Sequence, residues 1–103
     1  MKIQYDSVND TKIKLEWCKV MTHKPLDYRW ERVRSSSAYY FDTIIDNDKI
    51  VLLKSYDTIV AMYNKTQDKI IVCNKYSRTT SRHVTQFIGY YATLDTEIHF
   101  IEY

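Results

Sequence analysis

Hydrophobic and polar residues alternate along much of this chain, which is the pattern of strands with one buried and one exposed face. Residues 2–6 read KIQYD, with both apolar side chains on one face, and residues 96–103 alternate in the same way. Residues 27–33 and 38–45 combine aromatic and β-branched side chains at strand spacing. Residues 50–54 read IVLLK, a short apolar run that is typical of a buried strand.

Two turns follow from the polar segments between these runs. DNDK at residues 46–49 is a turn sequence, because Asp and Asn side chains bond to their own backbone and tolerate a left-handed conformation. TIVAMYN at residues 58–64 and KIIVCN at residues 69–74 are separated by four polar residues. This spacing predicts a β-hairpin.

A helix is predicted near residues 79–91. Val84, Phe87, Ile88 and Tyr91 recur at the spacing that forms one apolar stripe on a helix. The serines and threonines before this stripe can accept hydrogen bonds from the first, otherwise unpaired N–H groups.

Residues 12–21 fit two patterns. Ile13, Leu15 and Trp17 alternate as in a strand, whereas Ile13, Trp17, Val20 and Met21 also follow helical spacing. We expect a strand, with a helix as the alternative. The fold predicted from the whole pattern is α+β, with an antiparallel β-sheet of about five to seven strands and one principal helix near residues 79–91. Without a repeat or a linker, residues 1–103 are expected to form a single domain.

Composition excludes several classes of protein. One glycine and one proline in 103 residues argue against a disordered chain and against a glycine-rich phosphate loop. No apolar run approaches the ~18 residues of a membrane span, and the first residues lack the apolar core of a signal peptide. We therefore expect a cytoplasmic protein that does not enter a membrane.

The cysteines and histidines do not predict a metal site. Cys18 and Cys73 lie far apart in the sequence, and in a reducing compartment they would stay thiols. His23, His83 and His99 show no ligand spacing with either cysteine. No metal and no other cofactor is expected.

Residues 75–84 read KYSRTTSRHV, with three cations, four serines and threonines, one histidine and no acid. Arg78 and Arg82 are four residues apart and would share a face at the start of the helix, where free N–H groups attract anions. Either the segment binds an anion, or the hydroxyl residues only cap the helix beside solvated arginines. A Ser/His hydrolase is disfavoured, because no G-x-S-x-G occurs and Ser81 and His83 would point to different sides of a helix.

The ten tyrosines have three interpretations. They would fill the core and its rim, contact a protein partner, or stack on the bases of a nucleic acid. A net charge of +2 is low for a protein that follows a phosphate backbone. Tyr39 with Tyr40, and Tyr90 with Tyr91, place one ring on each side of an element, so one ring of each pair is expected to be exposed.

Residues 55–64 (SYDTIVAMYN) and 69–88 (KIIVCNKYSRTTSRHVTQFI) carry a resemblance. The pattern S-Y-x-T-x-V-A-x-Y, followed by Y-S-x-T-T-S-x-H, resembles a small uncharacterised domain family of phages and mobile elements of low-GC Gram-positive bacteria. The resemblance implies a phage-like accessory protein and assigns no catalytic residue.

These observations predict a non-enzymatic binding protein that engages and inhibits or modulates a host protein complex in the host cytoplasm. A defence nuclease is one instance of such a partner, which would make the protein anti-CRISPR-like. The alternative is a nucleic-acid-binding accessory protein, and an open edge strand would also allow two copies to pair as a homodimer. The predicted binding residues, which are mainly cations, are Tyr76, Arg78, Arg82, His83, Arg29 and Arg32.

Overall fold

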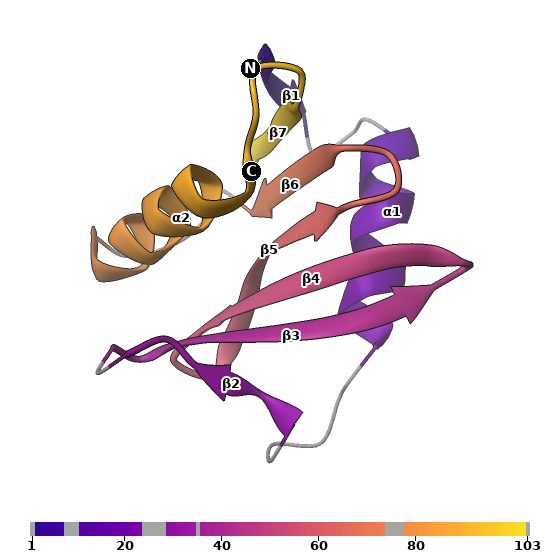
Figure 1. Ribbon diagram of the computed structural model, residues 1–103. Helices are drawn as coiled ribbons and strands as arrows, with labels where there is room; N and C mark the ends of the chain where they lie inside the picture. The colour runs from indigo at the N-terminus through magenta and orange to yellow at the C-terminus, as the bar shows by residue number, and fades with distance from the viewer. Residues whose placement is uncertain (1, 8–10, 24–28, 35, 74–77, 103) are drawn as a thin grey trace.

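The computed structural model of the protein describes residues 2–7, 11–23, 29–34, 36–73 and 78–102. Within these residues, seven strands form one sheet in the order β1-β7-β6-β5-β4-β3-β2, and two helices lie on its opposite faces (Figure 1). In chain order the elements are β1 (Lys2–Ser7), α1 (Thr11–Thr22), β2 (Glu31–Arg32), β3 (Ala38–Ile45), β4 (Asp48–Ser55), β5 (Thr58–Asn64), β6 (Lys69–Cys73), α2 (Arg78–Tyr91) and β7 (Glu97–Glu102).

Strands β2 to β6 form an antiparallel meander. The turn between β3 and β4 places Asp46 and Asn47 at φ 51° and 70°, which is the left-handed conformation that the DNDK sequence predicts. The hairpin predicted from residues 58–64 and 69–74 is also confirmed, since β5 and β6 pair antiparallel.

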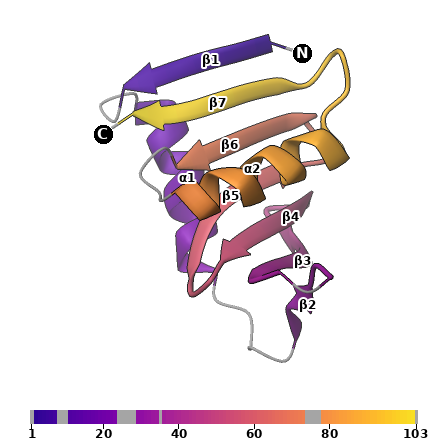
Figure 2. The ribbon, with the colours of Figure 1, turned by 90° about the vertical axis from the view of Figure 1, so that its left-hand side faces the viewer.

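The remaining edge of the sheet is parallel. Strand β7 pairs in parallel with β6 on one side and with β1 on the other. Parallel neighbours need a long connection, which α2 provides between β6 and β7 (Figure 2). The sheet is therefore mixed, which corrects the expectation of an antiparallel sheet, while the α+β class and the helix near residues 79–91 are confirmed.

Each face of the sheet packs against one helix. On one face, Val84 and Phe87 of α2 pack on a buried cluster from the central strands that includes Leu53 and Val72. On the other face, α1 contributes Ile13, Trp17 and Val20 to a second cluster.

The residues expected to form a strand at 12–21 are therefore helical, and the structure selects the alternative. The strand expected at residues 27–33 is shorter, with only Glu31–Arg32 in strand conformation among the described residues. Neither described helix has the length and apolar character required to cross a membrane. The single domain over residues 1–103 stays a prediction.

Candidate functional site: a tyrosine-lined cleft

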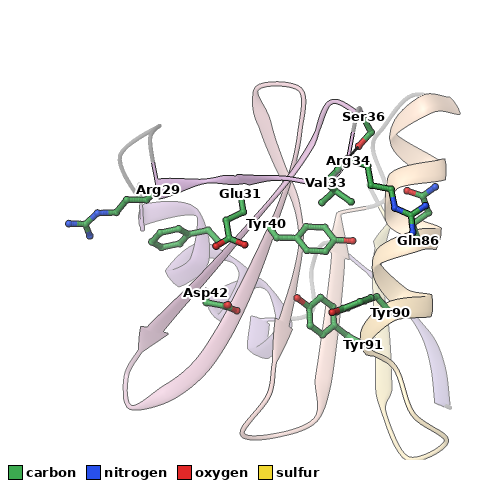
Figure 3. Close-up of a pocket in the computed structure, with 11 residues that line it drawn as sticks. Arg29, Glu31, Val33, Arg34, Ser36, Tyr40, Asp42, Gln86, Tyr90 and Tyr91 are labelled. Atoms are coloured by element: carbon green, nitrogen blue, oxygen red, sulfur yellow. Dashed lines mark hydrogen bonds between the residues drawn. The ribbon is translucent and has the colours of Figure 1, made fainter.

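A cleft of about 690 Å³ opens between β2, β3 and α2, near one edge of the sheet (Figure 3). Its lining combines aromatic rings with two arginines and two carboxylates, and consists of Arg29, Glu31, Val33, Arg34, Ser36, Tyr40, Phe41, Asp42, Gln86, Tyr90 and Tyr91. The cleft forms because β2 has only two strand residues, so that the short edge strand and the end of α2 leave an open space above β3.

Three of the aromatic residues that line this cleft are tyrosines, and the periodicity of their elements explains their positions. Tyr40 lies on the face of β3 that meets α2, and its ring contacts Phe87 edge-on at a centroid distance of 5.3 Å. Tyr91 continues the apolar stripe of α2, and its ring centroid lies 5.9 Å from that of Tyr40. The ring of Tyr90 contacts that of Tyr91 edge-on at a centroid distance of 4.7 Å, and Tyr90 is 75% exposed. The cleft thus has two packed rings at its base and one exposed ring at its rim.

The two packed phenols remain neutral at physiological pH. Burial raises the pKa of Tyr91 to about 12, with the nearby Asp42 carboxylate adding to the effect. Burial also raises the pKa of Tyr40, and Tyr90 adds to it. Lys65 lies 6.0 Å from the ring centroid of Tyr91 and forms an ion pair of 3.6 Å with Asp42. The base of the cleft therefore presents neutral hydroxyl groups that can donate or accept hydrogen bonds.

The charged groups of the cleft balance one another. Arg29 and Arg34 are offset by Glu31 and Asp42. Arg34 lies beside Gln86 of α2, whereas Arg29 lies at the other end of the cleft and points away from the tyrosines (Figure 3). The lining residues therefore carry charges of both signs, which suits a partner of mixed polarity.

Two of the predicted binding residues belong to this region. Arg29 lines the cleft. Arg82 is exposed on α2 four residues before Gln86, so both lie on the same helical stripe. Arg32 is exposed, but its strand partner is Tyr39, and its Nε atom donates a hydrogen bond of 2.8 Å to the carbonyl oxygen of Ser36. It therefore lies on the other side of the sheet from Glu31 and Tyr40.

His83 points into the protein. It is 5% exposed, and its Nδ1 atom lies 2.8 Å from the hydroxyl of Ser55, which is itself 3% exposed. The same hydroxyl lies 2.9 Å from that of Thr80, and the Tyr56 ring lies 5.8 Å from the imidazole. These contacts join the end of β4 to the first turns of α2. The Ser55 hydroxyl is therefore a buried group that both the imidazole of His83 and the hydroxyl of Thr80 approach.

Two further predicted binding residues are Tyr76 and Arg78. Tyr76 and the side chain of Arg78 lie outside the described residues, so anion binding and simple capping at the start of α2 both stay open. Among the residues that the structure describes, no three His, Cys, Asp or Glu side chains gather where they could hold a metal ion.

Sequence reasoning did not assign the central residues of the cleft to a site. The sequence identifies Tyr40, Tyr90 and Tyr91 as members of adjacent tyrosine pairs with one exposed ring each, and Tyr91 also as part of the apolar stripe of the helix. Nothing in the sequence indicated that the two pairs would meet, because one lies on β3 and the other on α2, about fifty residues later. Arg34, Asp42 and Gln86 also line the cleft only because α2 packs beside β3.

Comparison with known proteins places the chain in a family. The sequence profile of a family of unknown function, DUF8033, matches residues 30–101 and so includes the whole cleft except Arg29. No curated protein and no solved structure matches the chain.

Proposed function

The chain belongs to the DUF8033 family of unknown function, and from this premise we propose that it is a non-enzymatic domain that binds another protein through the tyrosine cleft. The observation that carries the proposal is the exposed ring of Tyr90 above the packed rings of Tyr40 and Tyr91. Tyrosine and arginine dominate the residues that contribute most to protein–protein binding, and both line this cleft.

Binding would use a surface that is already formed. Tyr40 and Tyr91 are held by Phe87 and by each other, so little side-chain freedom remains to be lost when a partner docks. Their neutral phenols would hydrogen-bond to a partner segment, while Arg34 and Gln86 would contact polar groups at the rim. Arg82 extends the same helical stripe and would enlarge the contact.

The identity of the partner rests on the sequence resemblance. Because residues 55–88 resemble a domain of phages and mobile elements, we propose that the partner is a protein complex of the host cell, with a CRISPR nuclease as one instance. Occupying a surface that this complex needs would inhibit or modulate it, and the domain would act in the host cytoplasm.

A nucleic-acid partner has weaker support from the cleft. Exposed Tyr90 could stack on a base, and Arg29, Arg34 and Arg82 could contact phosphates. Glu31 and Asp42 argue against a nucleic-acid partner, since their carboxylates line the same cleft and would repel phosphates. Nucleic-acid binding would weaken steeply with salt, whereas binding to a mixed-charge protein surface would respond less.

The test is affinity capture from host lysate with wild-type protein, Tyr90→Ala and the control Ile44→Ala. Ile44 is 66% exposed on β3 but does not line the cleft, so its loss controls for the removal of an exposed apolar side chain. We expect wild type and the control to retain one stoichiometric protein that Tyr90→Ala loses. Equal recovery by all three proteins, or recovery only of nuclease-sensitive material, would overturn the proposal.

A further inference from the structure

Strand β1 is the open edge of the sheet opposite the cleft. It is the outermost strand, and its neighbour in the sheet is β7 (Figure 2). The N–H group of Lys2 donates a hydrogen bond of 2.9 Å to the carbonyl oxygen of Thr96, so this residue bonds inward, toward β7. Since backbone groups alternate in direction along a strand, Gln4 also bonds inward and the backbone groups of Ile3 and Tyr5 point outward.

Two apolar side chains lie beside this edge, on one face of the sheet. Ile3 is 53% exposed and Tyr5 is 65% exposed. The Tyr5 ring stacks on Phe100 of β7 at 5.3 Å and 20°, on the face of the sheet that carries α2. Helix α2 lies over the central strands, and β1 lies at the edge of this face beyond it (Figure 2). Among the described residues no strand pairs with the outer side of β1, and an apolar strip next to such an edge is a template for strand addition.

We propose that a second copy of the chain pairs antiparallel with β1 around a two-fold axis at Gln4. This register places Ile3 opposite Tyr5 of the second copy, and Tyr5 opposite Ile3 of the second copy. Both residues have outward backbone groups, so each pair would exchange both of its N–H···O bonds. Their side chains lie on the same face and would form two aromatic–aliphatic cross-strand pairs.

The strand fits its own copy because its sequence is self-complementary. Residues 2–6 read cation, apolar, polar, apolar, acid. In a second copy that runs antiparallel with its position 4 opposite Gln4, positions 3 and 5 face each other, and so do positions 2 and 6. Each apolar residue is then opposite an apolar residue, and the cation is opposite the acid. A two-fold interface requires this self-complementarity, whereas an unrelated peptide would match it only by chance.

The dimer would carry two clefts at its far ends. Strands β1 and β2 are the two edge strands of the sheet, and the cleft lies beside β2. Pairing through β1 would therefore leave both clefts open, and a partner complex with repeated subunits could engage them together with increased avidity. The dimer itself does not depend on the function proposed for the cleft.

Sedimentation velocity of the purified chain over a range of concentrations tests the pairing, with circular dichroism to verify folding. We expect wild type to shift from monomer to twice the monomer mass as the concentration rises into the millimolar range. The double variant Ile3→Lys/Tyr5→Lys should remain monomeric, because each introduced lysine would face another across the axis. Ile44→Lys, at an exposed position far from β1, should dimerise as wild type does.

A second double variant tests the register. Ile3→Lys/Tyr5→Glu places opposite charges in contact only if position 3 faces position 5 of the second copy, so this variant should dimerise where Ile3→Lys/Tyr5→Lys does not. If the two-fold axis lay at Tyr5 instead, the introduced glutamates would face each other and the variant would be monomeric. A monomeric wild type at every concentration, or equal behaviour of the two double variants, would overturn the proposal.

Discussion

The Oγ atom of Ser55 lies 2.8 Å from the Nδ1 atom of His83, and the two residues are 28 positions apart in the sequence. Ser55 ends β4 and His83 lies one turn into α2, so this hydrogen bond connects the sheet to the start of the helix that borders the cleft. The Thr80 hydroxyl lies 2.9 Å from the same Oγ atom. A small buried polar cluster thus determines how α2 enters the fold.

Replacing Ser55 by alanine should destabilise the protein by about 1–3 kcal/mol, because it leaves the buried imidazole and the Thr80 hydroxyl without this partner. Urea unfolding followed by circular dichroism measures the change. The matched control is Ser81→Ala, the same substitution on α2 at a half-buried position, and we expect it to change stability by less than about 0.5 kcal/mol. Equal effects of the two substitutions would contradict a structural role for the cluster.

The polar residues of this cluster show what the sequence could and could not reveal. From the sequence, the arginines and the free N–H groups at the start of the helix predict an anion site, with helix capping by the hydroxyl residues as the alternative. Ser55, the partner of His83 and Thr80, lies on another element, and a run of polar residues does not reveal which members face inward. His83 and Thr80 are buried and Arg82 between them is exposed, as a helix that packs one side against a sheet requires.

Stability should fall at mildly acidic pH because of His83. Burial lowers the pKa of its imidazole below the ordinary 6.5, and Arg82 adds to the effect. Between the lowered pKa and pH 6.5, His83 binds a proton in the unfolded chain but stays neutral in the folded protein, which favours unfolding. The stability that depends on neutral His83 is therefore complete above pH 6.5 and is lost as the pH falls toward the lowered pKa. Urea unfolding across this pH window measures the loss.

The matched variant is His83→Gln, which keeps a polar side chain but cannot titrate. His23 and His99 are present in both proteins, so the difference between the two pH profiles isolates His83. We expect the variant to be less stable at neutral pH and to show a smaller loss on acidification. Parallel profiles would show that His83 does not resist protonation in the folded state.

Helix α1 illustrates how tertiary contacts settle an ambiguous pattern. Its residues fit either a strand or a helix, and the two patterns differ in whether Leu15 is buried. In the structure Leu15 is 59% exposed, whereas Ile13, Trp17 and Val20 are 5%, 7% and 1% exposed. The sheet is already complete without this segment, so a helix that covers its open face buries more apolar surface. That preference depends on strands that come later in the chain.

The contact between α1 and the sheet includes an ion pair that the sequence could not indicate. The Nζ atom of Lys69 on β6 lies 2.7 Å and 2.6 Å from the two carboxylate oxygens of Glu16. The two residues are 53 positions apart, and the lysine side chain is only 9% exposed. A charge so deeply buried depends on its partner, because water cannot replace the lost interaction.

Removing the carboxylate with Glu16→Ala should therefore destabilise the protein by about 3 kcal/mol, since the Lys69 ammonium would remain buried without its counter-charge. Glu16→Leu combined with Lys69→Met should recover most of the loss, because apolar side chains of similar volume often replace a buried pair without cost. Lys19→Gln is the control: its ion pair with Asp46 measures 2.8 Å, but both side chains are more than 60% exposed, so the unfolding midpoint should not change measurably. Urea unfolding of the four proteins separates these cases. If Glu16→Ala were as stable as Lys19→Gln, the contact between α1 and β6 would depend on apolar packing alone, and the double variant would then gain nothing over the single one.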